Sequence, residues 1–284
     1  MSQLLSISDE ACTRCGRCVV VCPAHIIKFQ EKDSVPGSYE GAESFCINCG
    51  HCVAVCPQGA LTHRSMSPDQ CPSMQPEWLL SPAQAEHVLR SRRSTRVFTK
   101  QNADRDLLTR LIELAKYAPT GHNSQTVNWH IVYEADDVRK LAGLVVDWMR
   151  HTILETPQTA KGMNMDRVVA AWEKGSDRIC RSAPHMILAH SAMDDRFAFN
   201  SCPIALSYLE LAAPSFGLGS CWAGYFTAAA RSWPPLQVAL GLPDKHIVFG
   251  GVLVGYPQYL YKRLPLRNKP LITWQQGESA PAGP

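Results

Sequence analysis

The sequence predicts an α+β protein made of a small cysteine-rich unit, a linker and a larger domain. Three observations lead to this prediction. A run of cysteines that ends in Cys-Pro occurs twice before residue 64, and a short apolar segment follows each run. Residues 65–82 are rich in Ser, Pro and Gln and show no periodicity, which is typical of a stiff, extended linker. From residue 83, helical and strand-like periodicities interleave, which favours a mixed fold.

Both cysteine runs have the spacing C-x-x-C-x-x-C-x-x-x-C-P, the first ending at Cys22-Pro23 and the second at Cys56-Pro57. This is the run of bacterial ferredoxins with two [4Fe-4S] clusters, in which three close thiolates hold one cluster and the fourth cysteine binds the other. One predicted cluster therefore has the ligands Cys12, Cys15, Cys18 and Cys56. The other has the ligands Cys46, Cys49, Cys52 and Cys22.

Structural zinc is the alternative for C-x-x-C pairs, but it needs neither a third cysteine at the same spacing nor a following proline. The clusters are therefore the favoured interpretation. Gly16 and Gly50, each just after the second cysteine, would let the backbone approach a cluster closely. The repeat predicts a ferredoxin-like βαβ-βαβ unit over residues 1–64, which depends on its clusters because it is too small for a large core.

Composition bounds the function of the whole chain. A net charge of +3 over 284 residues, without long basic runs, gives no nucleic-acid footprint. No apolar run is long enough to span a membrane, and residues 1–10 lack a secretory signal, so we expect a cytoplasmic protein that contacts neither membrane nor nucleic acid. The four remaining cysteines are scattered and are expected to be small buried side chains: Cys71, Cys180, Cys202 and Cys221.

The larger domain is expected to run from residue 83 to residue 284. Periodicity predicts helices over 83–92, 104–117, 136–151, 163–180, 203–216 and 236–240. It predicts strands over 129–133, 184–190 and 247–254, the last of the central type, and a strand or extended loop over 219–226. Trp78 and Leu79 suggest that the linker packs along a surface.

A basic segment, Arg92-Arg93-Ser94-Thr95-Arg96-Val97-Phe98, opens this domain. Three guanidinium groups and two hydroxyls on one turn suit phosphate oxygens, although a solvated basic helix end has the same composition. Three further motifs follow in order: Ala118-Pro119-Thr120-Gly121-His122-Asn123-Ser124-Gln125, Gly217-Leu218-Gly219-Ser220-Cys221-Trp222-Ala223-Gly224, and Gly250-Gly251-Val252-Leu253-Val254-Gly255-Tyr256-Pro257.

Together these motifs resemble the nitroreductase superfamily of FMN enzymes, in the subgroup with a fused N-terminal ferredoxin. The resemblance implies a nitroreductase-like α+β homodimer with FMN at the subunit interface. By position, the residues implied to hold the FMN phosphate are Arg92, Arg93, Ser94, Arg96 and Arg263. Pro119, Thr120, Gly121 and Asn123 match the loop that reaches the flavin from the partner subunit, and Gln125 follows in it. Ala223 and Gly224 match the backbone beside the flavin N5 edge.

The chain departs from the family pattern at three places. Tyr261 stands where a basic residue often precedes the last phosphate-binding arginine, with Lys262 next to it. Ala223 replaces a frequent carboxylate, which matters less because the implied contact there is backbone. Residues 126–129 replace the usual Pro-Trp after the glutamine, which bears on the substrate face.

No side chain is expected to be a required catalytic residue, because the flavin itself carries the chemistry. His122 could donate a proton but is more typical of a solvated loop histidine, and Cys221 is more typical of a packed side chain than of a redox thiol. A group of large side chains could form either a lid over the flavin or core: Trp148, Met149, Met163, Met165 and Trp172.

The sequence thus indicates an iron–sulfur flavoprotein oxidoreductase. A donor, ferredoxin or NAD(P)H, would give electrons through two [4Fe-4S] clusters to FMN, which would reduce a small organic substrate such as a nitro compound or a quinone. The alternative is a non-enzymatic electron carrier or redox sensor that holds the same cofactors.

Overall fold

The structure is a computed structural model that describes residues 3–31 and 34–275. The N-terminal unit contains β1 (Leu5–Ile7), α1 (Arg17–Val21), β2 (Ile27–Phe29), β3 (Pro36–Ser38), the 3₁₀ turn η1 (Ala42–Ser44), α2 (His51–Ala54) and β4 (Leu61–His63). Strand β1 pairs antiparallel with β4, and β2 pairs antiparallel with β3. The order β-α-β-β-α-β is the one expected from the repeat.

The core of this unit is small and contains several of the cysteines. Leu4, Ile26, Ile27 and Leu61 are almost fully buried, and Cys22, Cys46, Cys52 and Cys56 pack with or against them. With so few large apolar side chains, this unit buries little apolar surface. The two antiparallel strand pairs therefore depend on whatever the cysteines bind.

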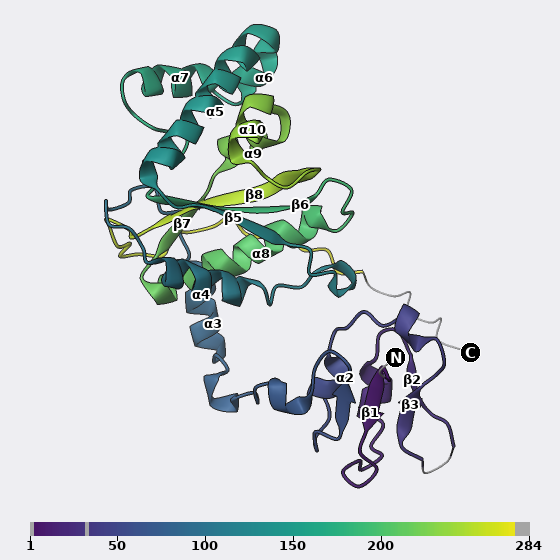
Figure 1. Ribbon diagram of the computed structural model, residues 1–284. Coiled ribbons are helices and arrows are strands. Elements are labelled where there is room, and N and C mark those ends of the chain that lie inside the picture. The colour runs from purple at the N-terminus through teal and green to yellow at the C-terminus, as the bar shows by residue number, and fades with distance from the viewer. Residues whose placement is uncertain (1–2, 32–33, 276–284) are drawn as a thin grey trace, which may run out of the picture.

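The linker leaves its apolar side chains in solvent. It contains the 3₁₀ turns η2 (Pro68–Gln70) and η3 (Pro76–Trp78), and α3 (Pro82–Ser91) follows it. Trp78 is 79% exposed and Leu79 is 66% exposed, so the expectation that they pack along a surface is wrong within this chain. Figure 1 shows the linker and α3 running from the N-terminal unit to the larger domain.

A four-stranded antiparallel sheet organises the larger domain. It consists of β5 (Asn128–Val132), β6 (His185–Ala192), β7 (Gly219–Trp222) and β8 (His246–Gly255), in the order β5-β6-β8-β7. Strand β8 lies between β6 and β7, as its continuous apolar sequence predicts. Alternate residues of β6 and β8 enter different cores, because successive side chains of a strand point to opposite faces.

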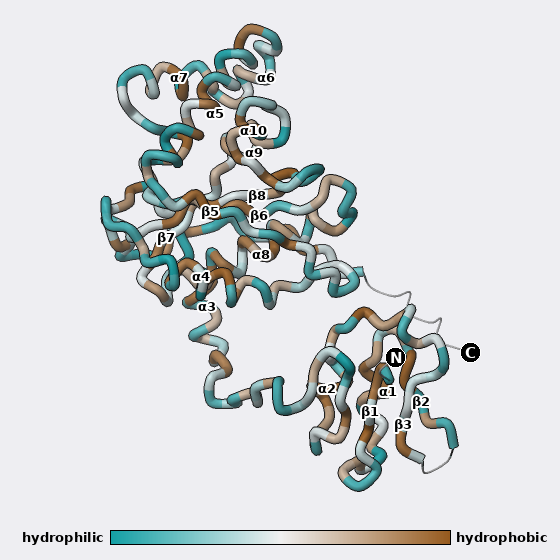
Figure 2. The backbone as a smooth tube through the Cα atoms, viewed as in Figure 1, coloured by the Kyte–Doolittle hydropathy of each residue, from teal (hydrophilic) through white to brown (hydrophobic). Residues whose placement is uncertain are grey.

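Helices cover both faces of the sheet (Figure 1). One face packs on α4 (Arg105–Ala115) and α8 (Ala198–Ala212), through Ile187 and Val252 of the sheet. The other face packs on α5 (Ala135–Glu155), α7 (Met165–Glu173), α9 (Gly224–Ser232) and α10 (Pro234–Leu240), through Leu188 and Leu253. Figure 2 shows hydrophobic residues on the central strands and within α4 and α8. The α+β prediction is confirmed.

Several element boundaries differ from those the sequence predicts. Helix α8 begins before Pro203, so the helix contains this proline and the turn η5 (Ala213–Phe216) follows it. The extended segment predicted over 219–226 is strand only to Trp222, since α9 begins at Gly224. A helix predicted over 163–180 is shorter and is preceded by α6 (Pro157–Gly162). A further 3₁₀ turn, η4 (Gly121–Asn123), precedes β5.

Beyond β8, residues 258–275 form no helix or strand and are exposed. Residues 276–284, which the sequence assigns to the same domain, lie outside the described residues. Among the helices that the structure describes, none combines the length and apolar character needed to cross a membrane.

Candidate functional site

Two cavities in the N-terminal unit are each lined by four cysteines. One is lined by Cys22, Cys46, Cys49 and Cys52. The other is lined by Cys12, Cys15, Cys18 and Cys56. Among the residues that the structure describes, no three Cys, His, Asp or Glu side chains converge on a single metal ion. Each set surrounds a space rather than a point, and four thiolates around one space are the ligands that a [4Fe-4S] cluster requires.

Glycines shape the turns that carry these cysteines. Gly16 and Gly50 both have φ of 72° and lie directly before α1 and α2. A residue with a side chain is strained in this left-handed conformation, so glycine is required by the turn itself. A Cβ at Gly50 would also lie 2.6 Å from Sδ of Met66. The sequence anticipated the close approach at these glycines but not the positive φ.

The cysteine thiols differ in acidity. Burial raises the pKa of the Cys52 thiol to about 11 and also raises the pKa of Cys18. A backbone hydrogen bond from Arg17 is the largest cause of the lowered pKa of Cys15. Because a cluster binds thiolates, its assembly must displace protons most unfavourably from the buried pair.

His63 at the end of β4 is a residue that the sequence analysis missed. It is 2% exposed, and its Nε2 lies 3.5 Å from Sγ of Cys46. The backbone N–H of Ser65 donates to Nδ1 of His63 at 3.1 Å, so in the neutral ring Nε2 carries the proton and points at the sulfur. A histidine at the inward position of the strand that follows Cys56-Pro57 is the sequence signal that could have identified it.

The basic segment of the larger domain lies beside the edge strand β7. The backbone N–H of Thr95 donates to the Ser220 carbonyl at 2.8 Å, and Ser94 pairs with Ser220. A Cβ at Gly219 would lie 2.2 Å from Oγ1 of Thr95, so glycine there permits this close approach. A cavity of about 380 Å³ next to the segment is lined by Arg92, Arg93, Thr95, Glu210, Ser220, Tyr261 and Lys262, among others.

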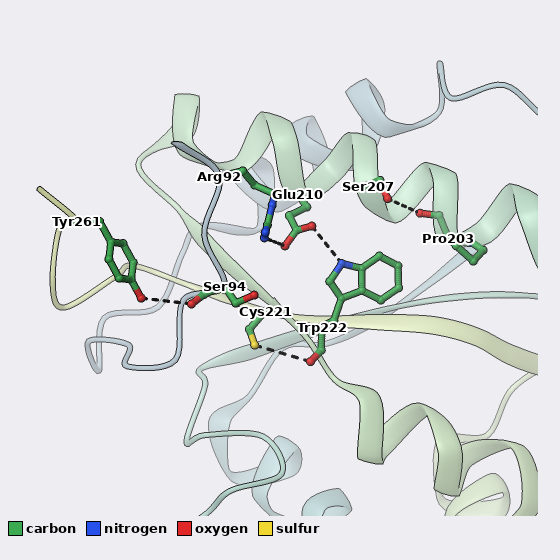
Figure 3. Close-up of polar contacts among 8 residues, drawn as sticks. All are labelled: Arg92, Ser94, Pro203, Ser207, Glu210, Cys221, Trp222 and Tyr261. Carbon is green, nitrogen blue, oxygen red and sulfur yellow. Dashed lines mark hydrogen bonds and ion pairs between the residues drawn. The ribbon is translucent and has the colours of Figure 1, made fainter. Parts of the chain in front are cut away.

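Arg92 faces an acid within the chain (Figure 3). Its guanidinium lies 2.9 Å from Oε1 of Glu210, which is 6% exposed, and Nε1 of Trp222 donates to Oε2 of the same carboxylate at 3.1 Å. Both carboxylate oxygens of Glu210 therefore have a hydrogen-bond partner. Part of the positive charge of Arg92 is therefore used inside the protein, a role that the sequence did not indicate. The signal for it was Glu210 as the one charged residue of helix α8.

The other implied phosphate ligands are more open. The guanidinium of Arg93 lies 5.8 Å from the centre of the Tyr261 ring, and the Tyr261 hydroxyl donates to the Ser94 carbonyl at 3.4 Å. Tyr261, which replaces a basic residue, thus supports Arg93 instead of supplying a charge. Arg96 and Arg263 are exposed. Among the described residues that line the cavity, Arg93 and Lys262 are cations with no carboxylate within ion-pair distance.

The loop that follows α4 is held in an unusual backbone conformation. His122, Asn123 and Gln125 all have φ between 51° and 52°. Such angles cost free energy for residues with side chains and persist where the surroundings enforce them. Here the backbone N–H of Gln125 donates to Oγ1 of Thr120 at 3.0 Å, and the Phe197 ring occupies the space where a Cβ of Gly121 would lie.

Asp195 joins this loop to the start of α8. Its carboxylate accepts hydrogen bonds from Oγ1 of Thr126, from Oγ of Ser191 at 2.8 Å and from the backbone N–H of Phe197 at 2.9 Å. Burial alone would raise the pKa of Asp195, but these hydrogen bonds outweigh it and lower the pKa below its ordinary value. The ionised carboxylate therefore stabilises the loop.

The same loop contacts the N-terminal unit. Nδ2 of Asn123 donates to the carbonyl oxygens of Ile47 at 3.0 Å and of Asn48 at 3.1 Å, both in the turn between Cys46 and Cys49. The side-chain amide of Asn123, which the resemblance implies to contact the flavin, therefore binds a cluster-binding turn in this structure.

The structure does not bring the loop and the basic segment together within one chain. The loop packs on Phe197 at the beginning of α8, whereas Arg92 contacts Glu210 near its end. Because a helix rises about 1.5 Å per residue, these two positions are about 20 Å apart along α8.

Of the two residues implied to contact the N5 edge, only one keeps its backbone N–H available. The N–H of Ala223 donates to the Gly251 carbonyl at 2.9 Å. Gly224 is exposed, nothing lies within 4 Å of the position of a Cβ, and it is the first residue of α9. The N–H groups at the start of a helix lack intrahelical partners, so Gly224 can donate to a ligand.

The remaining candidates belong to packing. His122 stacks on the Phe197 ring at 5.3 Å, and Cys221 is 5% exposed, as a packed side chain would be. Met149 and Met165 are fully buried, and Trp148, Met163 and Trp172 pack on the same core, so the described side chains of this group form core.

The N-terminal unit and the larger domain match two different families of known proteins. Residues 89–256 match the model of the nitroreductase family. The chain belongs to the nitroreductase family. Residues 11–60 match the model of the 4Fe-4S dicluster domain, so this oxidoreductase carries an N-terminal dicluster domain.

Individual relatives are distant. A protein of Archaeoglobus fulgidus, provisionally named NADH dehydrogenase/NAD(P)H nitroreductase, is 22% identical over 171 residues, which are 60% of this chain and 84% of the relative. A nitroreductase of Bacteroides fragilis with bound FMN has a TM-score of 0.55 and 20% identity over 68% of this chain and 99% of its own. One from Desulfitobacterium hafniense, also with FMN, has a TM-score of 0.54 and 22% identity over 67% and 97%. These structures show the shared fold.

Proposed function

We propose that this protein is an iron–sulfur flavoprotein oxidoreductase of the cytoplasm. It takes electrons from ferredoxin or NAD(P)H through two [4Fe-4S] clusters to FMN, and on to a small organic substrate such as a nitro compound or a quinone. The observation that carries the proposal is the union, in one chain, of two four-cysteine cavities with a nitroreductase domain. The FMN in the nitroreductases of similar fold supports the choice of flavin.

The residues present fit both kinds of cofactor. Four cysteines line each cavity of the dicluster domain, as two clusters require. In the larger domain, Arg93 and Thr95 line a cavity of about 380 Å³, where Arg93 and its neighbour in the chain, Ser94, would hold a phosphate. Gly224 offers a free backbone N–H at the start of α9 for the flavin ring.

The flavin site is proposed to form between two copies of the chain. Within one chain, the basic segment and the Asn123 loop lie near opposite ends of α8, about 20 Å apart at 1.5 Å per residue. A homodimer would let the loop of one subunit meet the basic segment of the other. Exposed apolar side chains on Leu264, Leu266 and Trp274 beyond β8 are consistent with a chain end that packs on a partner.

When bound, FMN would convert single electrons from the clusters into two-electron reduction of the substrate. The protein would contribute phosphate binding through Arg93 and orientation of the ring through Gly224. The fused clusters favour a one-electron donor such as ferredoxin over direct reduction by NAD(P)H.

An anaerobic reductive titration of the reconstituted protein tests the proposal. We expect a flavin absorbance in addition to the broad cluster absorbance, and uptake of about four electrons per chain, two for FMN and one for each cluster. Substrate-dependent reoxidation should follow. Uptake of about two electrons without a flavin spectrum would favour an electron carrier instead.

A further inference from the structure

The dicluster domain presents two similar turns, and the structure joins one of them to the larger domain. In the turn Cys46–Cys49, the carbonyl oxygens of Ile47 and Asn48 both accept hydrogen bonds from Nδ2 of Asn123, at 3.0 and 3.1 Å. One amide group thus contacts two consecutive peptide units of a cluster-binding turn. Neither the family match nor the dicluster match assigns this contact a role.

The larger domain holds Asn123 rigidly. The backbone N–H of Asn123 donates to the Thr120 carbonyl at 3.0 Å, and its φ is 52°, a conformation that asparagine tolerates better than most residues. Gly121 packs against the Phe197 ring at a distance that excludes any other residue. The carboxylate of Asp195 fixes both ends of this arrangement. The amide is therefore presented in one orientation.

The dicluster domain holds the acceptor turn equally well. The backbone N–H of Cys46 donates to the Ala42 carbonyl at 3.1 Å, and Nε2 of His63 contacts its sulfur. Asn48 has φ of 51°, a left-handed conformation that asparagine tolerates better than most residues. Two ordered groups meet at this contact, so little conformational entropy is lost when they bind.

The second turn has the same shape and a different environment. Arg14 occupies the position that corresponds to Asn48 and has φ of 55°, so the two turns are matched in backbone conformation. Cys15, the counterpart of Cys49, is exposed, whereas Cys49 is half-buried. The turn with Cys15 therefore faces solvent, from which a soluble electron donor would approach.

We propose that Asn123 docks the Cys46–Cys49 turn onto the larger domain, so that the cluster held by Cys22, Cys46, Cys49 and Cys52 is the one through which electrons leave the dicluster domain. The proposal rests on the proposed function and adds to it the direction in which electrons pass through the two clusters. The donor, a low-potential one-electron reductant such as reduced ferredoxin, would lose one electron per transfer at the turn with Cys15. That electron would leave by the Cys46–Cys49 turn. Asn123 is a positioning residue in this scheme.

The test replaces Asn123 in the full-length protein with both cofactors bound. Asn123→Leu keeps the branched shape of the side chain but cannot donate to Ile47 and Asn48. Gln125→Leu is the matched control, because Gln125 has φ of 51° in the same loop and its backbone N–H, not its side chain, donates to Oγ1 of Thr120. Amide hydrogen exchange is followed over residues 42–52, with residues 12–18 as the comparison turn within the same molecule.

Asn123→Leu removes both hydrogen bonds to the turn, so exchange over residues 42–52 should rise at least about tenfold. Exchange over residues 12–18 in Asn123→Leu, and exchange over both turns in the Gln125→Leu control, should be unchanged. In stopped-flow experiments with reduced ferredoxin, the clusters should be reduced at the normal rate while flavin reduction slows by a similar factor.

Unchanged exchange over residues 42–52, or an equal rise over residues 12–18, would overturn the docking role. A rise confined to residues 42–52 with normal flavin reduction would overturn the outlet assignment. If no flavin is present, the exchange result still tests the docking, so failure of the proposed function is distinguishable from failure of this inference.

Discussion

Nε2 of His63 lies 3.5 Å from Sγ of Cys46, and the Ser65 backbone fixes the ring so that the N–H faces the sulfur. A hydrogen bond to a cluster thiolate stabilises the more negative, reduced state of the cluster and so raises its reduction potential. This contact involves the same turn that Asn123 binds from the larger domain. The Cys46 turn therefore combines an electrostatic contact with a docking contact.

The first prediction concerns this potential. His63→Leu should lower the potential of one cluster by about 40 mV, because a hydrogen bond contributes about 1 kcal/mol and 59 mV corresponds to about 1.4 kcal/mol for one electron. An EPR-monitored redox titration measures the shift. His51→Leu is the control, since His51 is exposed and contacts the Cys49 carbonyl instead of a sulfur. Equal potentials in His63→Leu and the wild type would contradict the role of His63.

The second prediction separates two roles of Arg92. If Arg92 mainly neutralises Glu210, Arg92→Ala should destabilise the flavin-free protein by about 1–3 kcal/mol, because a buried carboxylate loses its ion pair. Adding Glu210→Gln should recover much of the loss. Arg90→Ala should cost little, since its partner Glu86 is exposed. Urea unfolding measures all four proteins, and equal losses in the two arginine variants would contradict this role.

The third prediction assigns the phosphate contact to Arg93. Arg93→Ala should weaken FMN binding by roughly tenfold to a hundredfold, which corresponds to one charged hydrogen bond of about 1.5–3 kcal/mol. Riboflavin, which lacks the phosphate, should bind both proteins equally. Flavin fluorescence titration measures the affinities, and Lys100→Ala serves as an exposed control. A matched loss of riboflavin affinity would show that Arg93 supports the fold of the site instead.

Sequence patterns predicted those parts of the molecule where one residue type has one dominant use. The cysteine spacing predicted the two sets that line the cavities, because cluster ligation leaves few alternatives. The continuous apolar run at residues 247–254 predicted a central strand, because such runs are typical of strands that are buried on both faces. The α+β architecture followed from such segments.

Contacts between segments that are distant in the chain could not be predicted from sequence patterns. Glu210 and Arg92 are 118 positions apart, and nothing local indicates that they form an ion pair. Asn123 was assigned to a flavin loop by resemblance, yet its amide contacts Ile47 and Asn48 across the domain boundary. Pro203 misplaced the start of α8, because tertiary packing outweighed the local preference of proline.

The fourth prediction concerns pH. The pKa of Asp195 is lowered in the folded protein by hydrogen bonds from Thr126, Ser191 and Phe197, so its contribution to loop stability is present above the unfolded pKa. That contribution should be lost as pH falls through the lowered folded value. Hydrogen exchange of residues 120–126 should therefore rise in acid, relative to residues 185–192 of β6, and Asp195→Asn should remove this difference. An unaltered acid response in Asp195→Asn would contradict the assignment.

The last prediction follows from the separation of the loop and the basic segment, about 20 Å apart along α8 at 1.5 Å per residue. If a flavin held by the Arg93 of one subunit lies at the Asn123 loop of the other, each dicluster domain supplies its partner's flavin. A subunit with Cys49→Ser and a subunit with Arg93→Glu should each be inactive with ferredoxin as homodimers. A purified mixed dimer should regain one of its two cluster–flavin pairs and about half of the activity, whereas an unpurified statistical mixture, of which about half is mixed dimer, should regain about a quarter. Differently tagged subunits allow the mixed dimer to be purified, and EPR confirms that the remaining cluster of Cys49→Ser is intact. A mixed dimer as inactive as its parents would show that each dicluster domain supplies the flavin of its own subunit.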